Sequence, residues 1–348
     1  MIHLSDFEKN LLKIVQEEIP LNDRPFKGIA HTLGSTESKV IDTLKDLKEK
    51  KIIRQISPIY DTKSLGYDSS LIAFKVNSNI EKVAEIINDH PGVSHNYQRT
   101  DDFNLWFTIA VPPDSELGLE RTVQLLAEIS DVDDYVILKT VKLYKIGVKL
   151  SFNDLREKDT VKKDDNKKNN INLTDIDKKI IKITQEDIPL VEKPFDILAQ
   201  KSDLPQEYII QKLQYYKKNG VMRRFAAILY HRKAGFKANG MTVWNVPQDK
   251  EDEVGYRLAS FRSVSHCYKR TTNEKWRYNI FSMIHGKTKE ELEGFVSEIS
   301  REIGIKDYKI LYSTKEFKKK RIKYFSDQFY KWEEEIKNGR YTQPDIKS

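Results

Sequence analysis

Apolar and polar positions follow one another along the chain in two similar series, each of which opens at helical spacing. Apolar residues recur every three or four positions over 7–15 and again over 176–183, which predicts an amphipathic helix in both places. Ser5 and Thr174 come just before these runs, and an acidic residue follows each of them three positions later. Both helices should therefore begin with a capping box.

Each series continues with two more helices and then changes to runs rich in β-branched residues. The first predicts helices from Pro25 and over 37–50, strands over 52–59 and 70–76, a helix over 80–88, strands over 93–99 and 104–111, a helix over 116–129 and a strand over 135–144. The second predicts helices from Pro194 and over 206–218, strands over 222–229 and 240–246, a helix over 250–260, strands over 264–270 and 279–285, a helix over 289–303 and a strand over 308–312. Three helices and a strand are typical of a winged helix-turn-helix, and the β-α-β-β-α-β order that follows is typical of a ferredoxin-like sheet. We therefore predict an α+β fold with two tandem copies of this domain pair.

The second series is a copy of the first. Residues 4–26 align without a gap with residues 173–195 at a constant offset of 169, and the same offset pairs Arg54 with Arg223. Residues 153–170 are mostly charged, so we expect a flexible tether that joins the halves without packing. The sheets of the two halves should then pair as a pseudo-heterodimer. The predicted parts are a helix-turn-helix domain at 1–60, a ferredoxin-like domain at 61–150, a linker at 151–172, the second helix-turn-helix domain at 173–229, the second ferredoxin-like domain at 230–325 and a C-terminal tail at 326–348.

Composition narrows the class of protein. The 348 residues include no apolar run near the roughly 20 residues that a membrane helix needs, and the N-terminus has no basic and apolar export signal, so we expect a cytoplasmic protein. The single cysteine, Cys267, excludes an internal disulfide and a cysteine cluster for zinc or iron–sulfur. Most of the net charge of +7 lies in the segment 315–325, which favours a solvated helix face over a docking site for an anion or nucleic acid.

The third helix of each predicted helix-turn-helix would carry the DNA contacts of a regulator. These helices begin with Ser35-Thr36-Glu37 and Pro205-Gln206-Glu207-Tyr208, where acidic and aromatic residues predominate. We therefore expect no sequence-specific DNA binding, although phosphate contacts elsewhere keep a DNA-binding regulator as the alternative.

One group of polar residues recurs in both copies of the sheet domain. His95, Tyr97 and Arg99 match His266, Tyr268 and Arg270, in each case at alternate positions of a predicted strand. Alternate residues of a strand share a face, so each set should form a row with neighbours about 6 to 7 Å apart. Each residue alone would be an ordinary surface or core group, but the recurrence of all three favours a functional row.

Two long segments carry a resemblance to a known family. Residues 91–108 (PGVSHNYQRTDDFNLWFT) resemble the signature of siroheme decarboxylase subunits, which are built on the fold of the Lrp/AsnC regulators. Residues 223–236 and 265–286 are similar to the other subunit type of that enzyme, so the chain looks like a fusion of the two. The resemblance implies removal of carbon dioxide from the two acetates of siroheme to give 12,18-didecarboxysiroheme, in alternative heme or heme d1 biosynthesis. Phe103 departs from the tyrosine that is frequent at that position.

The resemblance also implies roles for individual residues. His95 and His266 would be general acids, Arg99 and Arg270 would hold carboxylates, and the tyrosines between them would orient the group or relay the proton. Substrate-binding candidates are Arg54, Asn104, Trp106, Arg223, Arg224, His231, Arg232, Lys233, Tyr278 and Asn279. His231 and His285, which have no histidine at the equivalent first-half positions, are candidates for an axial ligand to the tetrapyrrole iron.

Several points stay open at this level. The resemblance implies that no external cofactor is required, because siroheme itself would carry the iron, but a bound heme is compatible with the sequence. A heme-responsive regulator and a non-catalytic tetrapyrrole carrier are the rival functions. Further homo-oligomerisation of the fused chain is also left open.

Overall fold

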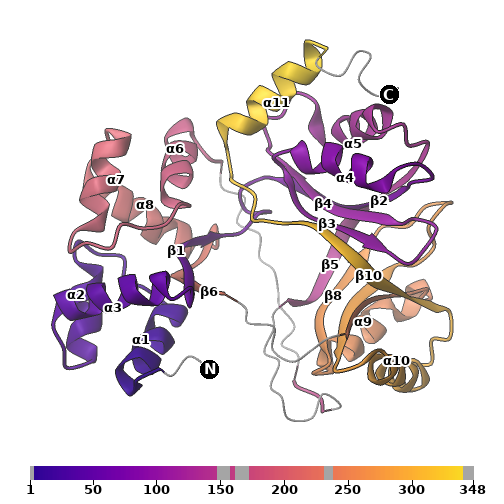
Figure 1. Cartoon of the computed structure of the whole chain (residues 1–348), viewed down its shortest axis with the longest axis horizontal. Coiled ribbons are helices and arrows are strands. Elements are labelled where there is room, and N and C mark those ends of the chain that lie inside the picture. Colours follow the sequence, from indigo (N-terminus) through magenta and orange to yellow (C-terminus); the bar gives the residue numbers. More distant parts are fainter. Residues whose placement is uncertain (1–3, 147–156, 161–171, 231–237, 340–348) are drawn as a thin grey trace. The chain divides into compact units, whose positions relative to one another are not determined.

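The computed structural model describes residues 4–146, 157–160, 172–230 and 238–339. The chain divides into two compact units, and both halves of the sequence contribute to each of them. One, here called the helical unit, comprises Met1–Tyr67, Lys167–Arg232 and Lys323–Asp327. The other, here called the barrel unit, comprises Asp68–Asn166, Lys233–Ile322 and Gln328–Ser348 (Figure 1).

The helical unit contains the two predicted sets of three helices. They are α1 (Asp6–Glu17), α2 (Pro25–Thr32), α3 (Glu37–Glu49), α6 (Asp175–Thr184), α7 (Pro194–Ser202) and α8 (Gln206–Lys218). The capping boxes predicted at Ser5 and Thr174 are both present. Strands β1 (Ile53–Tyr60) and β6 (Met222–Leu229) pair with each other in an antiparallel ribbon (Figure 1). The strand expected as a wing therefore pairs with the equivalent strand of the other half, a partner that local sequence does not reveal.

The two sets of helices are interlocked. Ile19 donates its backbone N–H to Phe225 of β6, and Ile188 donates reciprocally to Ile56 of β1. Each contact joins the loop after one half's first helix to the strand of the other half. The helical unit is therefore a single body built from both copies.

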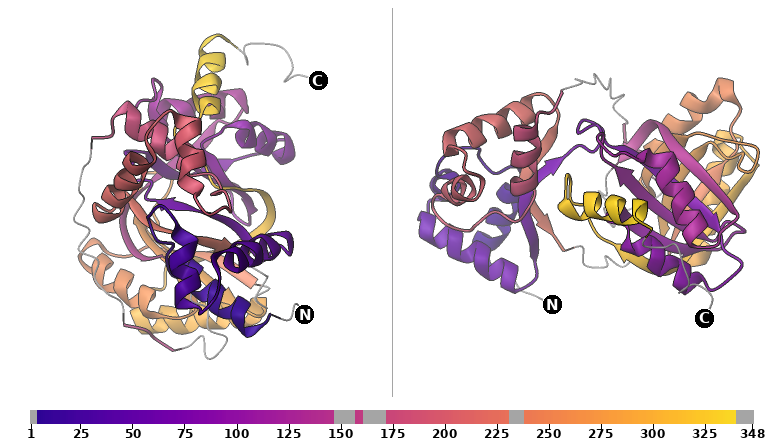
Figure 2. Two further views of the ribbon diagram at one scale, coloured as in Figure 1. Left: turned by 90° about the vertical axis from the view of Figure 1, so that its left-hand side faces the viewer. Right: turned by 90° about the horizontal axis from the view of Figure 1, so that it is seen from above.

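The barrel unit contains the two β-α-β-β-α-β series. The first consists of β2 (Asp68–Lys75), α4 (Ile80–Asp89), β3 (Val93–Arg99), β4 (Leu105–Val111), α5 (Gly118–Ile129) and β5 (Asp134–Ile146). The second consists of β7 (Ala238–Trp244), α9 (Glu251–Ser260, after a short 3-10 turn at Gln248–Lys250), β8 (Val264–Arg270), β9 (Ile280–Gly286), α10 (Lys289–Ile303) and β10 (Tyr308–Lys319). The strands close into a barrel in the order β10-β3-β4-β2-β5-β8-β9-β7. The helix pairs α4–α5 and α9–α10 cover its outside, each over its own half (Figure 2).

The barrel closes because each half lends its last strand to the other. β5 pairs with β2 of its own half and with β8 of the second half, while β10 pairs with β7 and with β3. Gly255 of α9 permits the close approach of β5, since a Cβ there would lie 2.3 Å from the ring of Tyr144. The predicted pairing of the two halves through their sheets is confirmed.

Three sequence expectations were wrong. The tail predicted at 326–348 includes helix α11 (Asp327–Lys337), whose Phe329 and Trp332 are buried against the first-half core. The linker predicted at 151–172 does pack where it is described, because Glu157 and Asp159 form ion pairs with Arg262. The segment 315–325 begins as the end of strand β10, which runs to Lys319 in place of the predicted 308–312 and is not a helix face.

Candidate active site

Strands β3 and β8 place the recurring residues on one face because their alternate side chains are fixed on the other. Asn96 of β3 is buried against α4, where its amide donates to the Ala84 carbonyl at 3.4 Å and to Asn88 at 3.1 Å. Cys267, its equivalent in β8, is fully buried beside α9, with its Sγ 3.6 Å from the Gly255 carbonyl. Since strand neighbours point in opposite directions, the histidine, tyrosine and arginine on either side all face the interior.

In both strands these three residues form a stacked row. The rings of His95 and Tyr97 are 6.2 Å apart and nearly parallel, and those of His266 and Tyr268 are 6.3 Å apart. The guanidinium of each arginine lies over the tyrosine of its own row, at 5.4 Å for Arg99 and 5.0 Å for Arg270. The row predicted from alternate spacing is present twice, and below we call the His95 set the first row and the His266 set the second row.

Each row arginine donates a hydrogen bond to the last strand of the other half, which we call the lent strand. Arg99 donates to the Leu311 carbonyl of β10 at 3.2 Å, and Arg270 donates to the equivalent Leu138 carbonyl of β5 at 3.1 Å and to Thr140 at 3.0 Å. The Nε of each has no hydrogen-bond partner among the residues that the structure describes. Burial lowers the pKa of each arginine to about 10, which still leaves it charged at neutral pH. Two guanidinium groups on the lining of one cavity are suited to binding carboxylates.

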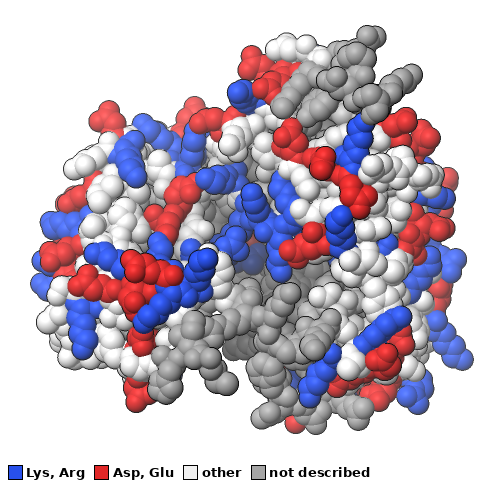
Figure 3. Space-filling model, viewed as in Figure 1, with Lys and Arg blue, Asp and Glu red and all other residues white. Residues whose placement is uncertain are grey.

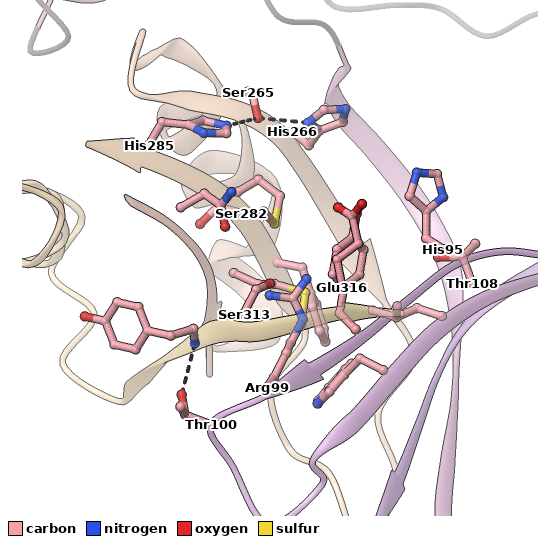
Figure 4. Close-up of a pocket in the computed structure, with 18 of the residues that line it drawn as sticks. His95, Arg99, Thr100, Thr108, Ser265, His266, Ser282, His285, Ser313 and Glu316 are labelled. Carbon is pink, nitrogen blue, oxygen red and sulfur yellow. Dashed lines mark hydrogen bonds between the residues drawn. The ribbon is translucent and has the colours of Figure 1, made fainter. Parts of the chain in front are cut away.

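Both rows line a single cavity of about 850 Å³, a volume within the range of roughly 300 to 1,000 Å³ that is usual for small-molecule sites. Figure 4 shows His95 and His266 approaching it from different halves of the chain. Trp106 and its second-half equivalent Phe281 line the same cavity with apolar surface. The other lining residues are Leu71, Thr100, Thr108, Ala238, Asn239, Met241, Ser265, Ser282, Met283, His285, Lys289, Tyr312, Ser313, Thr314, Lys315, Glu316 and Lys319.

A serine orients each row histidine. The hydroxyl of Ser94 lies 2.9 Å from Nδ1 of His95, and that of Ser265 lies 2.9 Å from Nδ1 of His266. Ser265 also contacts Nε2 of His285 at 2.7 Å, an extension that only the second row has among the described residues (Figure 4).

Burial and neighbouring cations shift the histidines toward their neutral forms. The pKa of His95 is lowered by burial and by the charge of Lys319, and raised by Glu316. The pKa of His266 is lowered by burial, by His95 and by Lys145. Burial and His266 lower the pKa of His285 to about 4. Burial therefore favours the neutral form of both row histidines, and His285 is neutral at physiological pH.

Comparison with known proteins decides which family this architecture represents. The family model of the AsnC-like ligand binding domain matches residues 64–145 and 233–318, and that of the siroheme decarboxylase NirDL-like HTH domain matches residues 8–54 and 177–223. A siroheme decarboxylase of Hydrogenobacter thermophilus is 50% identical over 95% of this chain and 98% of its own length. The chain belongs to the siroheme decarboxylase family.

Other relatives match either nearly the whole chain or a little under half of it. The siroheme decarboxylase NirDL subunit of Paracoccus pantotrophus is 29% identical over 91% of this chain and 97% of its own length. The beta subunit from Methanosarcina barkeri is 40% identical over 41% of this chain and 94% of its own length. A crystal structure of the siroheme decarboxylase NirDL in complex with an iron-uroporphyrin III analogue is 44% identical, covers 96% of this chain and 100% of that chain, and superimposes with a TM-score of 0.82.

Several residues predicted to bind substrate do not line the cavity. Asn104 and Asn279 fix strand ends, since each bonds both backbone groups of one residue, Val76 and Val246 respectively. Tyr278 is buried in the apolar core of the barrel beside Trp276. The structure thus places these three residues in strand-end and core positions and not on the cavity lining.

Of the three predicted arginines described outside the barrel unit, two are held by local partners. Arg223 forms an ion pair with Asp61 at 2.6 Å, Arg224 donates to the Gln16 carbonyl at 3.1 Å, and Arg54 is exposed on β1. All three belong to the helical unit. His231, Arg232 and Lys233 lie outside the described residues, so their predicted roles stay predictions.

The sequence did not point to the residues that β10 contributes. Glu316, Lys315 and Lys319 line the cavity, together with Lys289 of α10. The available signal is the basic segment 315–325, which by itself favours a solvated helix face. Its position opposite β3 depends on the exchange of strands and cannot be derived from local sequence.

Within the described ranges, no cluster of three or more His, Cys, Asp or Glu side chains could hold a metal ion. A search of those same ranges finds no helix with the length and apolar character needed to cross a membrane.

Proposed function

We propose that this chain removes carbon dioxide from the two acetate side chains of siroheme to give 12,18-didecarboxysiroheme. The observation that carries the proposal is the pair of stacked His-Tyr-Arg rows on one cavity, in a chain of the siroheme decarboxylase family. The complex of a 44% identical family member with an iron-uroporphyrin III analogue supports a tetrapyrrole in this fold. The alternative heme and heme d1 pathways both fit this reaction.

Binding follows from charge and shape. Siroheme has eight carboxylates, and the buried forks of Arg99 and Arg270 suit bidentate contacts to two of them. Lys315 and Lys319 add positive charge along one side of the cavity. Trp106 and Phe281 offer flat surfaces for the macrocycle.

The chemistry needs a proton and a place for an electron pair. When a row histidine protonates a ring carbon beside the acetate-bearing position, the ring can accept the pair released as the bond between the acetate methylene and its carboxylate breaks. Carbon dioxide leaves, the methylene carbon takes up a proton to become a methyl group, and the ring carbon returns its proton. Each acetate therefore consumes one proton overall, which a histidine can supply near neutral pH.

The rest of each row supports this step. The arginine would hold a carboxylate, and the tyrosine would orient the group or relay the proton. We expect no added cofactor, because the tetrapyrrole ring serves as the electron sink and the iron arrives with the substrate. His231 and His285 stay candidates for an axial contact to that iron, although Ser265 already engages Nε2 of His285.

We expect the helical unit to act as a scaffold and not as a DNA reader. The starts of both third helices are engaged within the unit, since Glu37 pairs with Arg24, and Gln206 donates to Asp23 at 2.5 Å. Acidic side chains are interspersed with basic ones over the described part of the face drawn in Figure 3. A duplex-binding assay at several salt concentrations checks this: specific binding at physiological salt would restore the regulator alternative.

The deciding experiment is anaerobic incubation of the purified chain with siroheme, followed by mass spectrometry of the pigment. We expect two successive losses of carbon dioxide with no other addition. The double variant His95→Ala, His266→Ala is the control and should leave siroheme intact. A wild-type chain that binds siroheme without any mass loss would instead indicate a carrier.

A further inference from the structure

The two rows are built alike but are opposed by different residues. On the first row, β10 places Ser313 opposite Arg99, Glu316 opposite Tyr97 and Lys319 opposite His95. On the second row, β5 places Thr140 opposite Arg270, Leu143 opposite Tyr268 and Ile146 opposite His266. Both pairings have register shifts at the same two steps. The two lent strands therefore correspond residue by residue.

Other contacts of the lent strands are equivalent as well. Lys318 of β10 donates to the His90 carbonyl at 3.2 Å, and its counterpart Lys145 of β5 donates to the Phe261 carbonyl at 2.8 Å. Leu311 and Leu138 accept from the two row arginines in the same way. The two strands otherwise correspond, so the difference between Glu316 and Lys319 on β10 and Leu143 and Ile146 on β5 is local to the site.

The cavity reflects this difference. Glu316, Lys319 and Lys315 all line it, whereas the β5 counterparts Leu143 and Ile146 do not. Glu316 is the only carboxylate among its described lining residues. In a cavity suited to an anionic substrate, a carboxylate is unfavourable for binding and needs a separate reason to be there.

We propose that Glu316 is a positioning residue for the first row, contributed by the second half of the chain, and that it makes the two rows perform their decarboxylations differently. This inference rests on the proposed function. The carboxylate stands opposite Tyr97 and acts electrostatically on both Tyr97 and His95, so it would orient the tyrosine hydroxyl and stabilise the protonated imidazole that delivers the proton. The second row has a leucine at that place and relies on Ser265 and His285 for the orientation of its histidine.

The charges agree with this arrangement. Burial and the adjacent Glu316 carboxylate raise the pKa of Tyr97 to about 12, which keeps its hydroxyl protonated and able to donate. The groups facing His95 are Ser94 of β3, Thr108 of β4, Lys319 and Glu316 of β10, and His266 of β8. Of these, Glu316 is the one that raises the pKa of His95. Its influence should strengthen when siroheme displaces water from the cavity, because the local dielectric falls.

The test compares Glu316→Gln with Glu85→Gln, which removes an exposed carboxylate from α4 of the barrel unit. We expect Glu316→Gln to slow one of the two decarboxylations about tenfold, which is the size of effect expected when roughly one charge-assisted interaction is lost. A singly decarboxylated pigment should then accumulate. The other step and the Glu85→Gln protein should match the wild type. Glu316→Asp should restore part of the lost rate.

The pH profile separates positioning from a structural role. The acid form of His95 is needed, and it is lost as the pH rises through its pKa. Without Glu316 that pKa is lower, so the rate of the affected step should begin to fall at a lower pH. Leu143→Glu is the matched change on the second row, and it should shift the pH profile of the other step to higher pH.

A readout independent of turnover is the titration of His95 and His266 by NMR in the full chain, with the signals assigned from single histidine variants. Glu316→Gln should lower the His95 pKa and leave that of His266 nearly unchanged. Equal slowing of both steps, or an unchanged His95 titration and pH profile, would overturn the proposal. If wild type releases no carbon dioxide, the proposed function fails, while the titration still decides whether Glu316 acts on His95.

Discussion

At the scale of single residues, the site depends on side chains that are unremarkable one at a time. The histidines and tyrosines of the two rows are each half-buried, and each arginine keeps one donor without a described partner. Their arrangement as two stacked rows creates the positive, partly desolvated surface that a polycarboxylate requires. In each row the histidine is the proposed acid and the arginine is the proposed carboxylate-binding residue, so the two roles can be tested separately.

Histidine and arginine variants should fail in different ways. His95→Ala or His266→Ala should leave siroheme bound while slowing decarboxylation, because the acid is used only in the transition state. Arg99→Ala or Arg270→Ala should also weaken binding, by about 1.5 to 3 kcal/mol for one lost contact to a charged group. Binding can be measured by titrating the pigment absorbance, and turnover by mass spectrometry.

The product pattern of the histidine variants carries more information. A singly decarboxylated pigment in one of them would assign that row to one acetate. Wild-type rates and product ratios in both single variants and in the double variant would contradict the acid assignment and direct attention to His285 and the tyrosines.

His90 predicts a pH dependence of stability. It is fully buried between Phe329 and Trp332, its Nδ1 accepts from the Gly92 N–H at 3.0 Å, and burial lowers its pKa to about 3. The unfolded chain, with an ordinary pKa near 6.5, takes up a proton first, so this stabilisation is present above about pH 6.5 and is lost progressively as the pH falls toward 3. His90→Phe, which copies Phe261 at the equivalent place, should flatten this part of the stability curve measured by urea unfolding at several pH values. Identical pH dependences in the two proteins would contradict this assignment.

At the scale of elements, the least expected feature is α11. Its Phe329 and Trp332 are buried against α4 and α5, and Glu333 accepts from Ser115 and the Leu117 N–H near the start of α5. From the sequence, this part of the chain is predicted only as a C-terminal tail. Its three successive acidic residues obscure the helical spacing of two aromatic residues that lie three positions apart. The helix acts as a cover for the first-half core.

Removing the central side chain of this cover should therefore be costly. We expect Trp332→Ala to lower the free energy of unfolding by about 3 to 5 kcal/mol, the usual range for a buried aromatic residue. Lys331→Ala on the same helix is the matched control, since its side chain is 76% exposed, and it should change stability by less than about 0.5 kcal/mol. A Trp332→Ala protein as stable as the control would mean that α11 does not pack as described.

Element types followed well from the sequence, while their partners did not. Strands β3 and β8 were placed at their observed bounds, because the spacing of their His, Tyr and Arg residues and the flanking turn residues are visible in the local sequence. The full length of β10 was missed, because only the exchange of strands shows that a charged run has a partner in β3. The six row residues could be predicted for the same local reason, and Glu316 could not, because it reaches the site from the other half.

At the scale of the whole molecule, the duplication explains why one chain carries two unequal copies. In a dimer of identical chains, the strand opposite each row would have the same sequence, so Glu316 could not face one row while Leu143 faces the other. Because the two halves have diverged, each of the two acetates of the unsymmetrical pigment can react beside a different set of side chains. The strand exchange keeps both sites within one barrel.

The exchange also predicts how the halves behave when separated. Expressed alone, residues 1–160 would leave β3 and β5 each without the partner that the other half supplies, and residues 172–348 would leave β8 and β10 in the same position. Exposed edges of this kind favour self-association, so we expect each fragment alone to aggregate or form non-native oligomers and to release no carbon dioxide from siroheme. Co-expressed, the two fragments should purify as a one-to-one complex that decarboxylates siroheme, which size-exclusion chromatography and pigment mass spectrometry can establish. A single fragment that is a folded monomer and removes both acetates would show that neither the barrel nor the second row is needed.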